Sequence, residues 1–157
     1  MNKVMIAPRK YVQGPGVLKD AGSLISAIGK KAVILWDPTV KGIVGDSLLS
    51  SLKEAGVGTV DVTFNGQSTK AEAERVAGII KKEGGDVTIA VGGGKTLDTA
   101  KAAASYAGTK SVTVPTIASN DSPTSSFTVW YDDEGTMLSF ESWGVNPDIV
   151  MVDTEVV

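Results

Sequence analysis

The sequence contains no cysteine and no histidine. The first absence excludes disulfides, thiol catalysis and cysteine-ligated metal, and the second removes the commonest general base and the commonest metal ligand. Basic clusters are absent too: the net charge is -3 and no run of Lys and Arg is dense enough for a nucleic-acid surface. We therefore expect no nucleic-acid partner, no catalytic residue and no metal ligand among these residues.

Long apolar runs are also missing. None approaches the roughly 20 residues that span a bilayer, and the apolar segment at the start is too short for a signal peptide. We therefore expect a cytoplasmic protein with no membrane partner. What is present is an ordinary globular composition, 42% apolar and 21% charged over 157 residues, enough for one domain with its own core.

Strand-like runs alternate with helix-like runs along most of the chain, which is typical of βαβ units. This pattern predicts an α/β fold with a Rossmann-like, mostly parallel sheet and helices on both faces. Towards the C-terminal end, two strand-like runs around the turn "DDEG" within 125–141 predict a β-hairpin. The expected strands of the sheet are 4–7, 32–36, 59–64, the run from 87 into the glycines, 111–116 and 148–153, with helices at 16–29, 39–55, 69–85 and after the glycines.

The stretch "VTIAVGGGKTLDTAK" places three glycines, Gly92 to Gly94, between a buried strand and a helix. Glycines let a ligand approach the backbone, and the first N–H groups of the helix point at an anion such as a diphosphate. Lys95 adds positive charge, whereas Asp98 either holds the loop through backbone N–H bonds or contacts a neutral part of the ligand. The alternative is a tight turn without a ligand, since the spacing matches neither G-x-G-x-x-G nor the P-loop.

Two further features follow the ends of expected strands. Asp37 ends a buried strand, where dinucleotide folds hold ribose hydroxyls and an acidic side chain repels the extra phosphate of NADP; it could equally form an Asx-Pro turn. Thr39 is a candidate cap for the helix after it. The segment 115–126 is mostly Ser, Thr, Asn and Pro, with Asp121 as its charged residue. It could line a polar pocket or be an ordinary polar loop.

Taken together, "GGGKTLDTAK", "PTIASNDSP" and "VWYDDEG" resemble the glycerol dehydrogenases, a branch of the metal-dependent, iron-type alcohol dehydrogenase family that also looks related to dehydroquinate synthase. The resemblance runs from residue 10 to residue 154. Two positions depart from the family pattern: Asn120 replaces Thr, and Phe127 replaces Leu. The resemblance implies NAD as cofactor, Asp121 as a hydrogen-bond partner of a substrate hydroxyl, and cofactor contacts at Asp37, Gly93, Gly94, Lys95, Thr96, Asp98, Thr116, Ser119, Ser125, Phe127 and Tyr131.

Members of that family continue into a helical second domain, whose Asp and two His hold a catalytic zinc or related divalent ion. The resemblance therefore implies that residues 1–157 are the NAD-binding half of an NAD-dependent glycerol dehydrogenase, inactive alone, which oxidises the small polyol glycerol to dihydroxyacetone and is a homo-oligomer at full length. The alternative is a stand-alone NAD-binding or regulatory module, and a third hypothesis is a phosphate-ester enzyme. Without the second domain, we expect an exposed apolar patch at Trp130, Trp143, Val156 and Val157.

Overall fold

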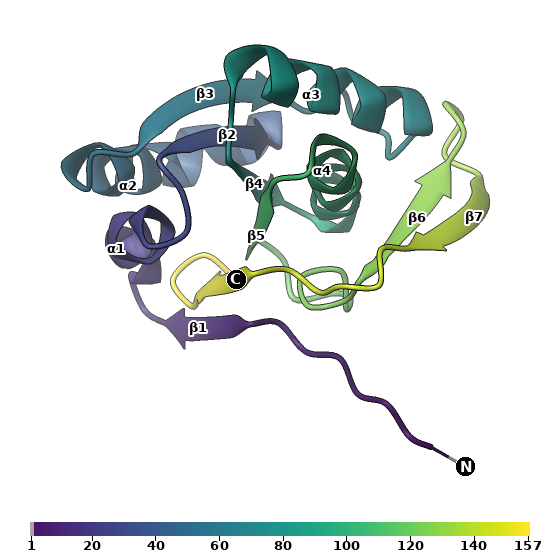
Figure 1. Cartoon of the computed structure of the whole chain (residues 1–157), viewed down its shortest axis with the longest axis horizontal. Coiled ribbons are helices and arrows are strands. Elements are labelled where there is room, and N and C mark those ends of the chain that lie inside the picture. The colour runs from purple at the N-terminus through teal and green to yellow at the C-terminus, as the bar shows by residue number, and fades with distance from the viewer. Residues whose placement is uncertain (1) are drawn as a thin grey trace.

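A computed structural model describes residues 2–157 and contains a six-stranded sheet with the order β1-β8-β5-β4-β2-β3 (Figure 1). Each pair of neighbouring strands is parallel. A separate antiparallel hairpin consists of β6 and β7. This architecture confirms the predicted α/β sheet and the hairpin. The strands are β1 (Lys10–Gly14), β2 (Lys31–Trp36), β3 (Gly58–Thr63), β4 (Val87–Gly92), β5 (Lys110–Pro115), β6 (Phe127–Tyr131), β7 (Met137–Ser142) and β8 (Ile149–Asp153).

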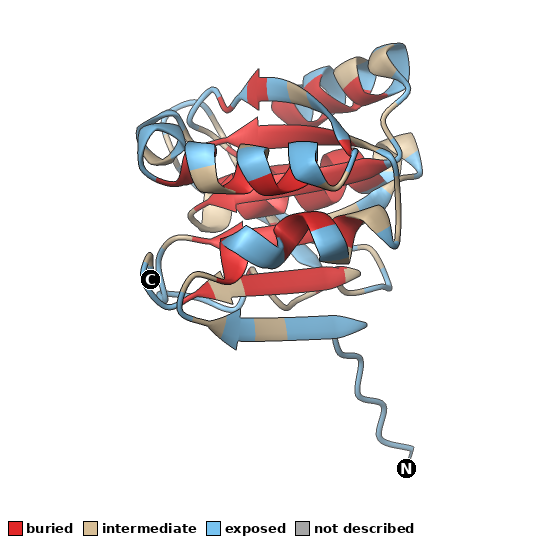
Figure 2. Ribbon diagram, turned by 90° about the vertical axis from the view of Figure 1, so that its left-hand side faces the viewer, coloured by how far each residue is buried: buried red, intermediate tan, exposed pale blue. Residues whose placement is uncertain are grey.

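Helices cover both faces of the sheet, as predicted. The 3-10 helix η1 (Val17–Asp20), α1 (Ala21–Ser26) and α2 (Pro38–Glu54) lie on one face, and α3 (Lys70–Glu83) and α4 (Gly94–Ala107) lie on the other. Side chains of β2 alternate between the two cores: Ile34 and Trp36 pack towards α2, while Val33 and Leu35 pack towards α3 and α4. Figure 2 shows the central strands buried between these layers and the edge strand β1 mostly exposed.

The first predicted strand, at residues 4–7, is wrong. These residues form no regular element, and Val4 and Met5 are 85% and 90% exposed on a segment that extends away from the body of the protein (Figure 1). The strand lies instead at Lys10–Gly14, where it pairs with β8. A short apolar run becomes a strand only when a neighbouring strand takes up its backbone hydrogen bonds, and β8 offers that edge to residues 10–14.

The hairpin packs against helices, and this contradicts part of the expected apolar patch. Trp130 is only 2% exposed because it packs on Ala73 of α3 and Ala102 of α4, and Trp143 stacks edge-on against Tyr106. The exposed apolar side chains of the hairpin are Phe127, Met137, Leu138 and Phe140. Within residues 2–157, no helix has the length and apolarity needed to cross a membrane.

The direction of the connections changes between β2 and β4. The chain leaves β2 through α2 to β3 on one side, and returns through α3 to β4 on the other side of β2. The carboxyl ends of β2, β4 and β5 meet there: the Asp37 N–H donates to the Val91 carbonyl at 2.9 Å, and the Thr116 N–H donates to the Gly92 carbonyl at 3.1 Å. Ligands of open α/β sheets bind at such a change of direction.

Candidate functional site

Gly92 ends β4 in a conformation that only glycine adopts readily. Its φ is +156°, and a Cβ at this position would lie 2.9 Å from the Asp37 Cβ and 2.9 Å from the Thr96 Oγ1. A Cβ on Gly94 would lie 2.7 Å from the Asn120 Nδ2. Gly93 has more room, since its nearest neighbour would be the Ile117 Cγ2 at 3.6 Å. The glycine turn is therefore packed tightly at its two ends and more open in the middle.

Helix α4 begins at this open middle. Gly93 is the N-cap residue, and no side chain caps the N–H groups of the first turn. Lys95 lies beside them: its Nζ donates to the Gln67 Oε1 at 2.7 Å and lies 4.6 Å from the centre of the Tyr131 ring. The Thr96 side chain, 1% exposed, is buried against Gly92. Backbone donors, the helix dipole and one cation together form an environment that favours an anion.

Asp37 lies next to the glycine turn and caps α2. Its Oδ1 accepts a hydrogen bond from the Thr39 N–H at 2.9 Å, and Pro38 occupies the first helical position. The prediction that Thr39 caps this helix is therefore wrong, because the acidic side chain two residues earlier reaches the same N–H. A capping carboxylate keeps acceptor capacity on its second oxygen. The half-buried Asp37 side chain can thus cap the helix and still accept from a ligand hydroxyl.

The polar loop after β5 folds around Asn120. The Asn120 Oδ1 accepts from the Ser122 N–H at 3.0 Å, and its Nδ2 donates to the Ser119 Oγ at 3.2 Å. Asp121 is exposed, and its carbonyl accepts from the N–H groups of Thr124 and Ser125, each at 3.0 Å. Asn120 therefore shapes the loop and packs against Gly94.

A cavity of about 310 Å³ lies between this loop and the hairpin. It has a polar side at Asp121 and Ser125, and an apolar wall that Phe127 and the hairpin supply. The structure thus brings four of the predicted site residues together around one space. The lining consists of Asp98, Asp121, Ser122, Ser125, Phe127, Val129, Met137 and Phe140.

The predicted residues fall into two groups. Most of the expected cofactor residues, from Asp37 to Thr116, lie along the sheet edge, whereas Asp98, Ser125 and Phe127 line the cavity with Asp121. Tyr131 does not line the cavity but contacts Lys95. Ser119 is exposed on the loop between the groups.

Lys101 is the residue that sequence reasoning missed. It is 5% exposed, and its Nζ lies 2.9 Å from the Asp98 Oδ1 and donates to the carbonyls of Ser122, Ser125 and Phe127. Burial lowers the pKa of Lys101, and the charge of Asp98 opposes that shift. The spacing of Asp98 and Lys101, three residues apart on a helix that is otherwise small and apolar here, is the pattern that could have revealed this pair.

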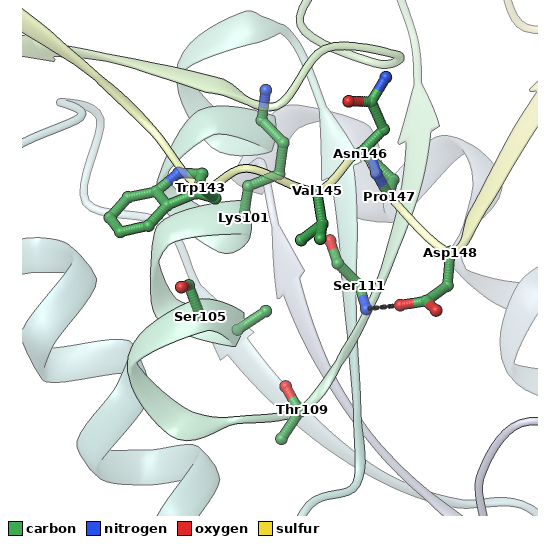
Figure 3. A pocket seen from close by; sticks show the side chains of 10 residues that line it. Lys101, Ser105, Thr109, Ser111, Trp143, Val145, Asn146, Pro147 and Asp148 are labelled. Atoms are coloured by element: carbon green, nitrogen blue, oxygen red, sulfur yellow. Dashed lines mark hydrogen bonds between the residues drawn. The ribbon is translucent and has the colours of Figure 1, made fainter. Parts of the chain in front are cut away.

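A smaller pocket of about 80 Å³ lies at the opposite end of the sheet (Figure 3). Thr109, Ser111 and Asp148 line it at the amino ends of β5 and β8, where the Ser111 N–H donates to the Asp148 carboxylate at 3.0 Å. None of the predicted site residues lines this pocket. Among residues 2–157, no three His, Cys, Asp or Glu side chains converge as metal ligands, so these residues do not fit the metal ion that the resemblance implies.

Comparison with known proteins gives consistent matches over the chain. The family model described as iron-containing alcohol dehydrogenase matches residues 8–154. The chain is 42% identical over its whole length to a glycolaldehyde reductase of Halobacterium salinarum, and 36% identical to a glycerol dehydrogenase of Pseudomonas putida. The crystal structure of a probable glycerol dehydrogenase from Sinorhizobium meliloti 1021 superposes with a TM-score of 0.91 and 32% identity over 99% of this chain.

These relatives are longer than the chain. It spans 43% of the two curated relatives and 42% of the solved structure. The match to the family model nevertheless extends from before β1 to just past β8, and thus includes the whole sheet, the glycine turn and the hairpin. The chain belongs to the iron-containing alcohol dehydrogenase family.

Proposed function

We propose that this chain is the NAD-binding half of an NAD-dependent glycerol dehydrogenase. The observation that carries the proposal is the arrangement of three features along one edge: Asp37 after β2, the glycine turn after β4, and the cavity bounded by the loop after β5. An acidic group, an anion-binding turn and a partly apolar cavity match the order of ribose, diphosphate and nicotinamide in a dinucleotide.

In this proposal the adenosine ribose binds Asp37 and the diphosphate lies at the first turn of α4. Packing at Gly92 supports the fit, since a Cβ there would collide with Asp37 and Thr96 and distort the edge where the cofactor binds. Lys95 supplies a cation beside the diphosphate. Further contacts come from Gly93, Gly94, Thr96, Thr116 and Ser119, and the nicotinamide half reaches Ser125, Phe127 and Tyr131.

Asp121 is the proposed substrate-binding residue. Its exposed carboxylate borders the cavity, where it can accept a hydrogen bond from a hydroxyl of glycerol. NAD, when bound, accepts the hydride that leaves the alcohol carbon. The residues of this chain bind and orient the two reactants. We propose that the metal ion is held by a second, helical domain, and that the complete protein is a cytoplasmic homo-oligomer.

A second candidate is the reduction of a short hydroxyaldehyde at the same site. It is favoured by the 42% identity to a protein named glycolaldehyde reductase, compared with 36% to a glycerol dehydrogenase. Both activities move a hydride between a nicotinamide and a small hydroxylated carbon compound, so both use the same cavity. Rates of the complete protein with glycerol and NAD, and with glycolaldehyde and NADH, separate the two candidates.

Calorimetric titration of the chain with NAD, NADP and ADP-ribose tests the cofactor proposal. We expect NAD and ADP-ribose to bind and NADP to bind at least about tenfold more weakly, because Asp37 repels the 2′-phosphate. Absence of binding by all three would contradict the cofactor site. Tight binding of a sugar phosphate without NAD would instead support a phosphate-ester enzyme.

A further inference from the structure

Lys101 carries a buried ammonium group whose hydrogen bonds are all made within the protein. Burying an unpaired ammonium is costly, so such a group persists only with a counter-ion and further acceptors. Here the Nζ lies 2.9 Å from the Asp98 Oδ1, and donates to the Ser122 carbonyl at 2.9 Å, the Ser125 carbonyl at 3.2 Å and the Phe127 carbonyl. One ammonium group thus donates to three carbonyls within a stretch of six residues.

Asp98 makes further hydrogen bonds to the same segment. Its Oδ2 accepts from the Val129 N–H at 2.9 Å, and its Oδ1 accepts from the Ser122 hydroxyl. The Asp98 carbonyl accepts from the Thr128 hydroxyl at 2.9 Å. The ion pair therefore fixes the beginning, the middle and the end of residues 122–129, a segment that leaves the polar loop and enters β6.

An irregular segment needs this kind of support. Residues 122–126 lie outside the strands, and β6 pairs with β7 only from Phe127 onwards. Buried carbonyls without donors destabilise the fold, so the irregular part depends on other donors. A lysine side chain supplies three N–H donors at one point. An apolar side chain of the same length would fill the space but leave the carbonyls of Ser122, Ser125 and Phe127 without this donor.

Residues 122–129 also supply one wall of the 310 Å³ cavity, through Ser122, Ser125, Phe127 and Val129. We propose that Lys101 is a positioning residue, which through its ion pair with Asp98 sets the shape of the cavity that receives the nicotinamide half of the cofactor. The inference rests on the proposed function. It assigns a role to a side chain that contacts neither the sheet edge nor the substrate residue Asp121.

The first test measures how well the backbone amides of residues 122–129 are protected from exchange when no ligand is bound. Amide hydrogen exchange of Lys101→Met is compared with that of Leu52→Ala, a control in α2 on the opposite face of the sheet whose side chain is fully buried. We expect exchange in residues 122–129 to accelerate at least about tenfold in Lys101→Met, with β2 and β4 unchanged. In Leu52→Ala, we expect the faster exchange to lie in α1 and α2. Equal exchange of residues 122–129 in wild type and Lys101→Met would overturn the inference.

The second test uses two probes that report on different ends of the site. NADH fluorescence reports the surroundings of the nicotinamide, whereas ADP-ribose affinity reports the sheet edge alone. We expect Lys101→Met to lose most of the fluorescence change on binding NADH while its ADP-ribose affinity changes less than about threefold. An equal loss on both probes would contradict a role confined to the cavity. If the wild-type chain binds neither probe, the proposed function fails, and the exchange experiment still decides whether Lys101 positions the segment.

A double variant keeps the test decisive if Lys101→Met does not fold. Removing one partner of a buried ion pair leaves an unpaired charge, whereas replacing both partners removes that cost. We therefore expect Asp98→Asn/Lys101→Met to fold more stably than Lys101→Met and yet to retain fast exchange in residues 122–129. Wild-type protection of that segment in the double variant would overturn the inference.

Discussion

The two halves of the proposed site are built in different ways. At the sheet edge, Asp37, Gly92 and Thr116 are placed by backbone hydrogen bonds between parallel strands. Around the cavity, residues 122–126 are irregular and lead into β6, and the segment 122–129 is held by the side chains of Asp98 and Lys101, from 21 to 31 residues away in the sequence. The comparison indicates that the anion-binding edge depends on the main chain, whereas the cavity depends on one buried ion pair.

The largest effect should come from breaking the sheet edge. Gly92→Ala adds a Cβ 2.9 Å from two neighbouring atoms at a positive φ, so we expect it to lower the free energy of unfolding by at least about 2 kcal/mol and to abolish ADP-ribose binding. Urea denaturation and calorimetry measure both. Gly93→Ala is the matched control, with a stability change within about 0.5 kcal/mol because its Cβ has room. Equal destabilisation by the two variants would contradict the packing argument.

The next-largest effect concerns the loop at Asn65, which the Glu72 side chain holds by hydrogen bonds. It tests whether such side-chain support makes the free energy of unfolding sensitive to acid. The buried Glu72 accepts from the Asn65 N–H at 3.0 Å and from the Arg75 guanidinium at 2.7 Å. Burial alone would raise the pKa of Glu72, but the hydrogen bonds from Arg75 and Asn65 outweigh it and hold this pKa below its ordinary value of 4.5. The folded state therefore takes up this proton at lower pH than the unfolded state. Stability from Glu72 is complete above the unfolded pKa and is lost as pH falls through the folded pKa.

Glu72→Gln should consequently lower the free energy of unfolding by about 1–3 kcal/mol at pH 7 and flatten its fall between about pH 5 and 3. Denaturant titrations at several pH values measure this difference. Glu74→Gln, at an exposed position on the same helix, is the control and should leave the pH dependence unchanged. A similar flattening in Glu74→Gln would mean that general charge, not the buried cluster, sets the acid sensitivity.

A moderate effect on cofactor choice should distinguish Asp37 from other acidic groups. Asp37→Asn keeps a helix cap but removes the charge, so we expect NADP affinity to rise about tenfold and NAD affinity to fall a few-fold in calorimetric titrations. Asp61→Asn is the control, because the Asp61 carboxylate already accepts from Trp36 at 2.7 Å and Lys41 at 2.8 Å. A comparable gain in NADP affinity from Asp61→Asn would show that net charge alone controls the preference.

The smallest effect concerns the contact between Lys95 at the sheet edge and Tyr131 of the hairpin. Lys95 lies at the first turn of α4 but reaches Gln67 and the Tyr131 ring. Lys95→Met should weaken ADP-ribose binding about threefold at low salt, and less at high salt, because a partly exposed charge is screened. Gln67→Ala keeps the charge and should change the affinity less than Lys95→Met does. An effect of Lys95→Met that is independent of salt would contradict an electrostatic role.

Most of the fold could be predicted from local patterns. Alternating strand and helix runs indicated the parallel sheet, and the turn "DDEG" between two strand-like runs indicated the hairpin. The errors concern segments whose pairing or burial depends on a segment far away in the sequence. Residues 4–7 look like a strand, but β8 pairs with Lys10–Gly14, and Trp130 looks like part of an exposed surface until α3 and α4 cover it. Apolar character alone does not say which surface will be buried.

The candidate site likewise contains residues that local patterns indicate and residues that depend on distant contacts. The glycine turn and Asp37 could be recognised as candidates because both patterns are local in the sequence. They are glycines between a strand and a helix, and a carboxylate at the end of a strand. For Lys101, the spacing from Asp98 could indicate an ion pair, but nothing near it in the sequence indicates which carbonyls it will meet. For Asp98 the sequence left two roles open, holding the loop through backbone N–H bonds or contacting a ligand, and the structure shows it accepting from the Val129 N–H beside Ser122 and Lys101.

The sequence by itself determined the alternation of strands and helices along the chain, the glycine turn and the acidic residue that follows β2. These depend on backbone preferences and on the periodicity of apolar side chains, which act over a few residues. The tertiary structure decided the order of the strands within the sheet, the position of the hairpin against α4 and the ion pair that shapes the cavity. Those features depend on contacts between segments far apart in the chain, and a buried charge such as Lys101 is stable only where folding brings its partners around it.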